Sequence, residues 1–181
     1  MLETVTGDPA LKLCLRAMLC ALFAIAVVHK ISAPAAFIGT VRTYRLVPSP
    51  LVPLAAVVLI VAEAGAALAL LANSRAGSAL AVLLLALYTV AILINIWRGR
   101  RDIDCGCAGP YVRESLSYRL VARNALFLSI ALVTLLPVVS SRPLGPLDWF
   151  TALASAVTFA LLFFAVSQLS AIGRDGDPSL H

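Results

Sequence analysis

Charged residues are scarce in this chain of 181 residues. Aspartate, glutamate, lysine and arginine make up 13% of it, against about a quarter in an average soluble domain. Hydrophobic residues make up 61%. This composition excludes an ordinary soluble protein and predicts an integral membrane protein. The length fits one compact bundle, so we expect a single membrane domain over residues 1–181 and no second domain.

Several familiar site patterns are also missing. Outside the apolar segments there is no glycine-rich phosphate loop, no zinc-type spacing of cysteine and histidine, and no Ser-His-Asp arrangement. We therefore expect no metal site. The net charge of +5 comes from basic residues in the loops between apolar segments, which is typical of membrane topology. We expect no nucleic-acid partner.

Five apolar segments are long enough to cross a bilayer as helices, since a span needs about 20 residues. The predicted fold class is therefore all-α, an integral membrane helical bundle in the inner cell membrane. Lys12 and Arg16 before an apolar run also resemble a signal peptide, but His29 and Lys30 at its end favour a span. The predicted spans are about 11–31, 53–72, 78–97, 118–136 and 147–172, with loops at 32–50 and 98–117.

The loop at 98–117 contains the only close cysteine pair, Cys105 and Cys107, separated by Gly106. Two Cα atoms two residues apart lie roughly 5.5–7 Å from each other, which overlaps the range of about 4.4–6.8 Å that a disulfide allows. So small a ring is expected to be strained, and strained disulfides exchange readily. We interpret the pair as a thiol–disulfide redox site. Cys14 and Cys20 cannot bridge each other on one helix and are expected to be packing residues.

Polar residues gather at the same end of the predicted spans. With five spans in alternating directions, Lys30, Asn95, Arg98 and Arg123 share a depth with the cysteine loop. Each alone could be an interfacial anchor or an interhelical hydrogen bond. Together beside a cysteine pair, they are candidate polar site or ligand-binding residues. Cationic neighbours also lower a thiol pKa in general.

Glu63 is the second outlier, because it lies near the middle of an apolar span. A carboxylate at that depth costs at least about 2.5–3.5 kcal/mol, so it should face the bundle interior and be paired or protonated. The functional interpretation is a proton acceptor or a polar partner for Lys30, His29 or a ligand. The structural alternative is a buried hydrogen bond. Tyr88 in the third span is expected to be a packing residue.

The orientation of the bundle is left open by two opposing arguments. Of the fourteen basic residues, ten lie on the side of the cysteine loop, which makes that side cytoplasmic by the positive-inside rule. A protein that makes disulfides would instead present its cysteines to the oxidising compartment.

The stretch Asp104-Cys-Gly-Cys-Ala-Gly109, preceded by Asn95-Ile-Trp-Arg-Gly99 and followed by Arg123-Asn124, resembles the methylamine utilization protein MauE family of DoxX-like membrane proteins. Phe23, His29-Lys30 and Glu63 fit the same pattern. The resemblance covers roughly residues 15–135, and it departs from the family at Ala108, where a phenylalanine is expected.

The resemblance implies a four-helix DoxX-like core plus a fifth C-terminal helix. It also implies disulfide formation or maturation of exported proteins, with Cys105 and Cys107 as a catalytic redox pair. Lys30, Glu63, Asn95 and Arg123 would be polar site residues. The expected partner is a thioredoxin-like or exported thiol protein, and a quinone in the membrane is the expected electron acceptor.

Three functions compete at this point. The first is a membrane thiol–disulfide oxidoreductase. The second is a non-catalytic assembly or binding subunit, in which Cys105 and Cys107 form a static disulfide or hold a soft metal with help from a partner. The third is a transporter that uses Glu63 and Lys30, against which the missing inverted repeat argues.

Overall fold

The computed structural model describes residues 8–100, 103, 116–137 and 143–175, with side chains up to residue 166. Over these residues the chain is helical and contains no strand. The helices are α2 (Pro9–Ser32), α3 (Pro34–Tyr44), a 3-10 turn η1 (Ser49–Leu51), α4 (Val52–Leu71), α5 (Arg75–Trp97), α6 (Tyr118–Leu135) and α7 (Pro146–Asp175).

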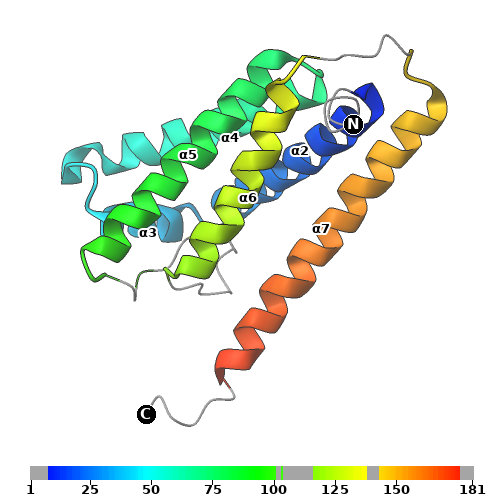
Figure 1. Cartoon of the computed structure of the whole chain (residues 1–181). Coiled ribbons are helices and arrows are strands. Elements are labelled where there is room, and N and C mark those ends of the chain that lie inside the picture. The colour runs from blue at the N-terminus through cyan, green and yellow to red at the C-terminus, as the bar shows by residue number, and fades with distance from the viewer. Residues whose placement is uncertain (1–7, 101–102, 104–115, 138–142, 176–181) are drawn as a thin grey trace.

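The helices form a membrane bundle around α2 (Figure 1). Helix α2 packs against α4, α6 and α7, while α5 packs against α4 and α6. The short α3 lies across one end of the bundle against α4. Helix α7 packs along α2, and its C-terminal half extends past the end of the four-helix core. The site described below therefore lies in a core of α2, α4, α5 and α6.

Local sequence signals set where the helices begin. The Asp8 carboxylate accepts a hydrogen bond from the Ala10 backbone N–H at 2.7 Å, and Pro9 occupies the first position of α2. Ser74 caps α5 and Ser117 caps α6 through the same kind of bond. These caps satisfy backbone N–H groups that have no partner inside the helix.

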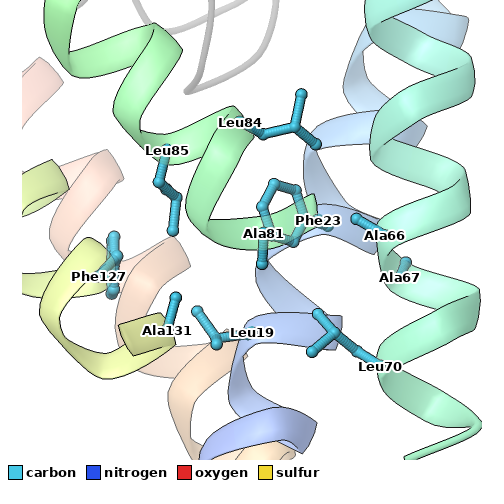
Figure 2. Packing of buried hydrophobic residues seen from close by; sticks show 10 residues of the cluster. All are labelled: Leu19, Phe23, Ala66, Ala67, Leu70, Ala81, Leu84, Leu85, Phe127 and Ala131. Carbon is cyan, nitrogen blue, oxygen red and sulfur yellow. The ribbon is translucent and has the colours of Figure 1, made fainter. Parts of the chain in front are cut away.

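Small residues let the helices approach closely in the core (Figure 2). Phe23 of α2 lies between Ala66 of α4 and Ala81 of α5, and the two alanines are completely buried. Leu19 and Ala131 continue the same cluster toward α6. Membrane helices associate through this kind of close packing, because lipid tails remove the hydrophobic drive between them.

The outer faces of the helices are apolar and exposed, as lipid-facing surfaces are. Five helices in the described part of the chain are long and apolar enough to span a membrane. Leu54 and Val61 of α4 and Phe150 of α7 are each more than 60% exposed. The predicted fold class, an all-α membrane bundle with a fifth C-terminal helix, is confirmed. The single domain over residues 1–181 stays a prediction.

The first loop, expected at 32–50, differs from the prediction because it contains α3 and η1. Pro34 sits in the first turn of α3, where its missing N–H costs nothing. Phe37, Val41 and Tyr44 follow at intervals of three and four residues, which places them on one face of a helix. Too short to be noticed as a span, this amphipathic helix closes one side of a cavity described below.

Candidate functional site

The centre of the site is an ion pair between Lys30 and Glu63. Lys30 lies in the last turn of α2 and Glu63 lies in the middle of α4, so packing of these two helices brings them together. Their side chains are 5% and 1% exposed. The Lys30 ammonium donates a hydrogen bond to Glu63 Oε1. At this burial each charge needs the other, since an isolated charge in the bilayer interior is costly.

Aromatic rings complete the surroundings of this pair. The Tyr88 hydroxyl on α5 donates to Glu63 Oε1 at 2.5 Å. Lys30 Nζ lies 5.0 Å from the centroid of the Phe37 ring and 5.2 Å from that of Tyr88, within cation–π range. Tyr88 packs against the core, as expected, but it also contributes this hydrogen bond, which the sequence reasoning did not foresee. Two features of the sequence could have indicated this contact. Tyr88 places a hydroxyl in an apolar span, and the short turn between α4 and α5 brings that span alongside α4.

Arg123 and Asn124 on α6 reach the same region. They line a small cavity of about 40 Å³ together with Lys30, Glu63 and Tyr88. The Arg123 guanidinium lies 5.5 Å from the centroid of the Phe163 ring on α7. Glu63 Oε2 and Asn124 Nδ2 are buried and have no hydrogen-bond partner within the described part of the chain. Three of the five predicted polar site residues, Lys30, Glu63 and Arg123, therefore share one cavity.

Asn95 and Arg98 form a separate group at the end of α5. Asn95 is completely buried, and its Nδ2 donates to the Ala91 carbonyl at 3.0 Å. Arg100 Nη1 lies 3.4 Å from Asn95 Oδ1. Arg98 is the exposed C-cap residue of α5. Neither Asn95 nor Arg98 lines the cavity beside Glu63. A shared depth in the membrane was therefore not enough to predict that they reach this cavity.

Cys105 and Cys107 lie outside the described residues, but both ends of their segment are placed. The Leu116 backbone N–H donates to the Ile103 carbonyl at 3.2 Å. Both side chains are buried in a cluster with Ile92, Ile96 and Leu120, against which Tyr44 packs. Residues 103 and 116, which flank the cysteine pair in the sequence, thus lie side by side between α5 and α6. In the sequence, Cys105 follows Ile103 by two residues.

Comparison with known proteins gives the family. The family model "Methylamine utilisation protein MauE" matches residues 8–137. Proteins named methylamine utilization protein MauE are 35% identical in Paracoccus versutus, covering 94% of this chain and 93% of that protein, and 36% identical in Methylorubrum extorquens, covering 95% and 94%. This chain belongs to the MauE family. No solved structure matches it significantly.

The MauE match covers the four-helix core, α3 and the cysteine segment, and it ends before α7. The curated MauE proteins extend the similarity over almost the whole chain. A multi-pass membrane protein, as predicted, is therefore supported both by the five apolar helices and by the family.

Two further buried cations in this MauE-family chain lie at the opposite end of the bundle. Lys12 Nζ donates to the carbonyls of Leu136 and Pro137, the latter at 2.7 Å. Arg16 donates to the Asn73 carbonyl at 3.0 Å and to the Thr134 carbonyl at 3.2 Å. These carbonyls lie at the C-terminal ends of α4 and α6, where a cation is favoured. From the sequence alone, both residues are interpreted only as topology charges or as the start of a signal peptide.

The two remaining cysteines, Cys14 and Cys20, lie on α2. Cys14 and Cys20 are free thiols, and the Cys20 thiol donates to the Ala67 carbonyl at 3.3 Å. Within the described residues, no group of three histidine, cysteine or acidic side chains could hold a metal ion.

Proposed function

We propose that this MauE-family membrane protein is a thiol–disulfide oxidoreductase that serves methylamine utilisation, by forming disulfides in an exported partner protein. The observation that carries the proposal is the Cys105-Gly106-Cys107 pair, in a segment whose ends are bonded together between α5 and α6. The names of the relatives support the pathway. The spacing of the two cysteines supports the chemistry.

The exchange would proceed through a mixed disulfide. A thiolate of the partner attacks one sulfur of the Cys105–Cys107 disulfide, and the bond between the two cysteines breaks as the mixed disulfide forms. The second thiolate of the partner then attacks the partner's sulfur atom in the mixed disulfide. This releases Cys105 and Cys107 as two thiols and leaves a disulfide in the partner. The partner loses two electrons and two protons, and the cysteine pair gains them.

Regeneration of the cysteine pair needs an electron acceptor, and a quinone dissolved in the membrane is the acceptor implied by the DoxX-like resemblance. The buried pair of Lys30 and Glu63 supports a role in this half of the cycle, because a charge pair in an apolar bundle is costly to keep. Arg123 lies on the same cavity and would contribute to its polarity. Asn95 and Arg98 are proposed to serve the cysteine segment instead.

The test is alkylation trapping of the membrane-embedded protein over a series of redox buffers. Cys105 and Cys107 should titrate between disulfide and dithiol. In the single variant Cys107→Ser, the Cys105 thiolate should attack the disulfide form of the substrate, releasing one substrate thiol, and the resulting mixed disulfide should accumulate because no second cysteine resolves it. The double variant Cys105→Ser/Cys107→Ser should lose substrate oxidation. The matched double variant Cys14→Ser/Cys20→Ser removes the same number of thiols from α2 and should retain it.

Two results would reject the proposal. Full substrate oxidation by the Cys105→Ser/Cys107→Ser variant would show that the pair is not catalytic. A pair that stays oxidised in every buffer would identify a static disulfide, and the protein would then be an assembly or binding subunit.

A further inference from the structure

A second and larger cavity lies on the other side of Lys30. It has a volume of about 280 Å³ and is lined mainly by residues of α3, α4 and α5. Helix α3 contributes Phe37, Thr40, Val41 and Tyr44, which share one helical face. Among the described residues that line it, Lys30 is the only charged one, and Lys30 and Tyr88 line the smaller polar cavity too. The two cavities thus share Lys30 and Tyr88 as lining residues.

The burial of the lining residues shows which way this cavity opens. Val58 of α4, Leu87 of α5 and Leu46 are 56%, 49% and 40% exposed, as apolar side chains facing lipid are. Lys30 and Phe37 are buried at the other end. An occupant would therefore enter from the bilayer and reach the ammonium group with its leading end.

The charges at the inner end select the chemistry of that occupant. Lys30 has three N–H donors, and Glu63 accepts one of them while compensating the positive charge. An anionic ligand would add an uncompensated buried charge, which is costly. A neutral hydrogen-bond acceptor would bind to the ammonium group without adding a charge. The rings of Phe37, Tyr44 and Tyr88 favour a flat ring, which packs well against aromatic side chains.

We propose that this cavity, named here the α3 pocket, binds the ring of a lipid-soluble quinone, with one ring carbonyl accepting a hydrogen bond from Lys30 Nζ. A quinone is flat, neutral, apolar and ends in a carbonyl acceptor. The volume of about 280 Å³ lies just below the roughly 300–1000 Å³ usual for small-molecule sites, so the pocket holds one ring and leaves the tail in the lipid.

The smaller cavity gives this site a route for protons. A space of about 40 Å³ is large enough for water, which needs about 10–15 Å³. Water there would bond to Glu63 Oε2 and Asn124 Nδ2, two of the buried polar atoms that have no hydrogen-bond partner within the described part of the chain. Glu63 then connects this water to Lys30.

The redox purpose of the α3 pocket rests on the proposed function. When bound, a quinone supplies an acceptor for two electrons and two protons, the number that two thiols release on forming a disulfide. Two thiols and a quinone thus give a disulfide and a quinol. Tyr44 and Ile92 line the pocket and also belong to the contacts that hold Ile103 and Leu116, so the pocket adjoins both ends of the cysteine segment.

The test measures saturable binding of a decyl-substituted benzoquinone to the full-length protein in lipid nanodiscs. Ala91→Phe on α5 and Ala55→Phe on α4 place a ring inside the pocket from two different walls. Ala125→Phe is the matched control, since Ala125 is exposed on α6 and lines neither cavity. The double variant Lys30→Met/Glu63→Met removes the donor while keeping the site neutral.

We expect both pocket variants to weaken binding at least tenfold and Ala125→Phe to leave it unchanged. Lys30→Met/Glu63→Met should also weaken binding about tenfold or more, since a hydrogen bond from a charged donor is lost. Decylbenzene, which lacks the carbonyls, and decanoate, which is anionic, should compete poorly. Absence of saturable binding, equal effects of Ala91→Phe and Ala125→Phe, or effective competition by decylbenzene or decanoate would overturn the inference.

The cysteine variants separate this inference from the proposed function. Cys105→Ser/Cys107→Ser should bind the benzoquinone as the native protein does while losing thiol oxidation. If the native protein oxidises thiols but shows no saturable quinone binding, the α3 pocket assignment fails and the proposed function stands. If quinone binds but the cysteine pair is inert, the binding assignment stands without its redox purpose.

Discussion

Replacing Lys30 by methionine should destabilise the bundle strongly, and replacing Glu63 at the same time should restore most of the loss. In the single variant Lys30→Met, the Glu63 carboxylate stays 1% exposed and keeps only the hydrogen bond from Tyr88 among those described above. The ammonium that compensated it is gone. In Lys30→Met/Glu63→Met no charge remains, and two flexible apolar side chains of similar length fill the space.

The magnitudes follow from the burial of the pair. Removing one partner of a buried ion pair costs about 3–5 kcal/mol, whereas replacing both by apolar residues is often close to neutral. We therefore expect Lys30→Met to lower the free energy of unfolding by about 3–5 kcal/mol. The double variant should be within about 2 kcal/mol of the native protein and more stable than Lys30→Met, although it carries one more substitution.

The assay is unfolding by sodium dodecyl sulfate in mixed micelles, followed by far-ultraviolet circular dichroism. Arg98→Met is the control, because it removes a cation that is exposed at the end of α5 and should change stability by about 0.5 kcal/mol or less. If the double variant were as unstable as the sum of the two single variants, Lys30 and Glu63 would be independent, and the structural reasoning about the ion pair would be wrong.

Two further predictions use the same unfolding assay. Gly77→Ala should lower the free energy of unfolding by at least about 1–3 kcal/mol, because a Cβ there would lie 2.5 Å from backbone atoms of Ala69 and Leu70. Gly65→Ala is the control: its Cβ would lie 3.9 Å from the nearest neighbouring atom, so it should be neutral or stabilising by about 0.5–1 kcal/mol. Equal losses of stability in the two variants would contradict this packing. Lys12→Met should cost about 1.5–3 kcal/mol, because the carbonyls at the end of α6 lose a charged donor. An unchanged stability would show that this contact does not hold α6.

The site shows how far reasoning about helix directions can go. Alternating spans predict which helix ends share a membrane depth, and this was enough to suggest Lys30 as a partner of Glu63. It was not enough to separate Arg123, which lies on their cavity, from Asn95, which does not. Depth is a single coordinate, and the rotation of each helix about its axis decides the direction of its side chains. That rotation follows from contacts such as Phe23 against Ala66 and Ala81.

The role of α3 also could not be predicted by searching the sequence for membrane-spanning segments. Its eleven residues are too few to cross the bilayer, and its apolar residues look unremarkable in a loop. Only when α3 lies against α4 do Phe37 and Tyr44 close a cavity that ends at Lys30. Likewise Lys12 and Arg16 look like flanking charges until the ends of α4 and α6 are placed beside them.

By itself, the sequence determined that this protein is a multi-pass helical membrane protein, because charge is scarce and five apolar runs are long enough to satisfy their backbone groups in lipid as helices. The motif around Cys105 and Cys107 indicated the MauE family by resemblance, and the family model confirms that membership. It also singled out Glu63, because a carboxylate in the middle of such a run must find a partner. Tertiary structure alone decided which partners it has and where the two cavities lie. Those features depend on which faces of α2, α4, α5 and α6 meet, and neighbouring apolar helices can meet on several faces at nearly equal cost until small and large side chains interlock.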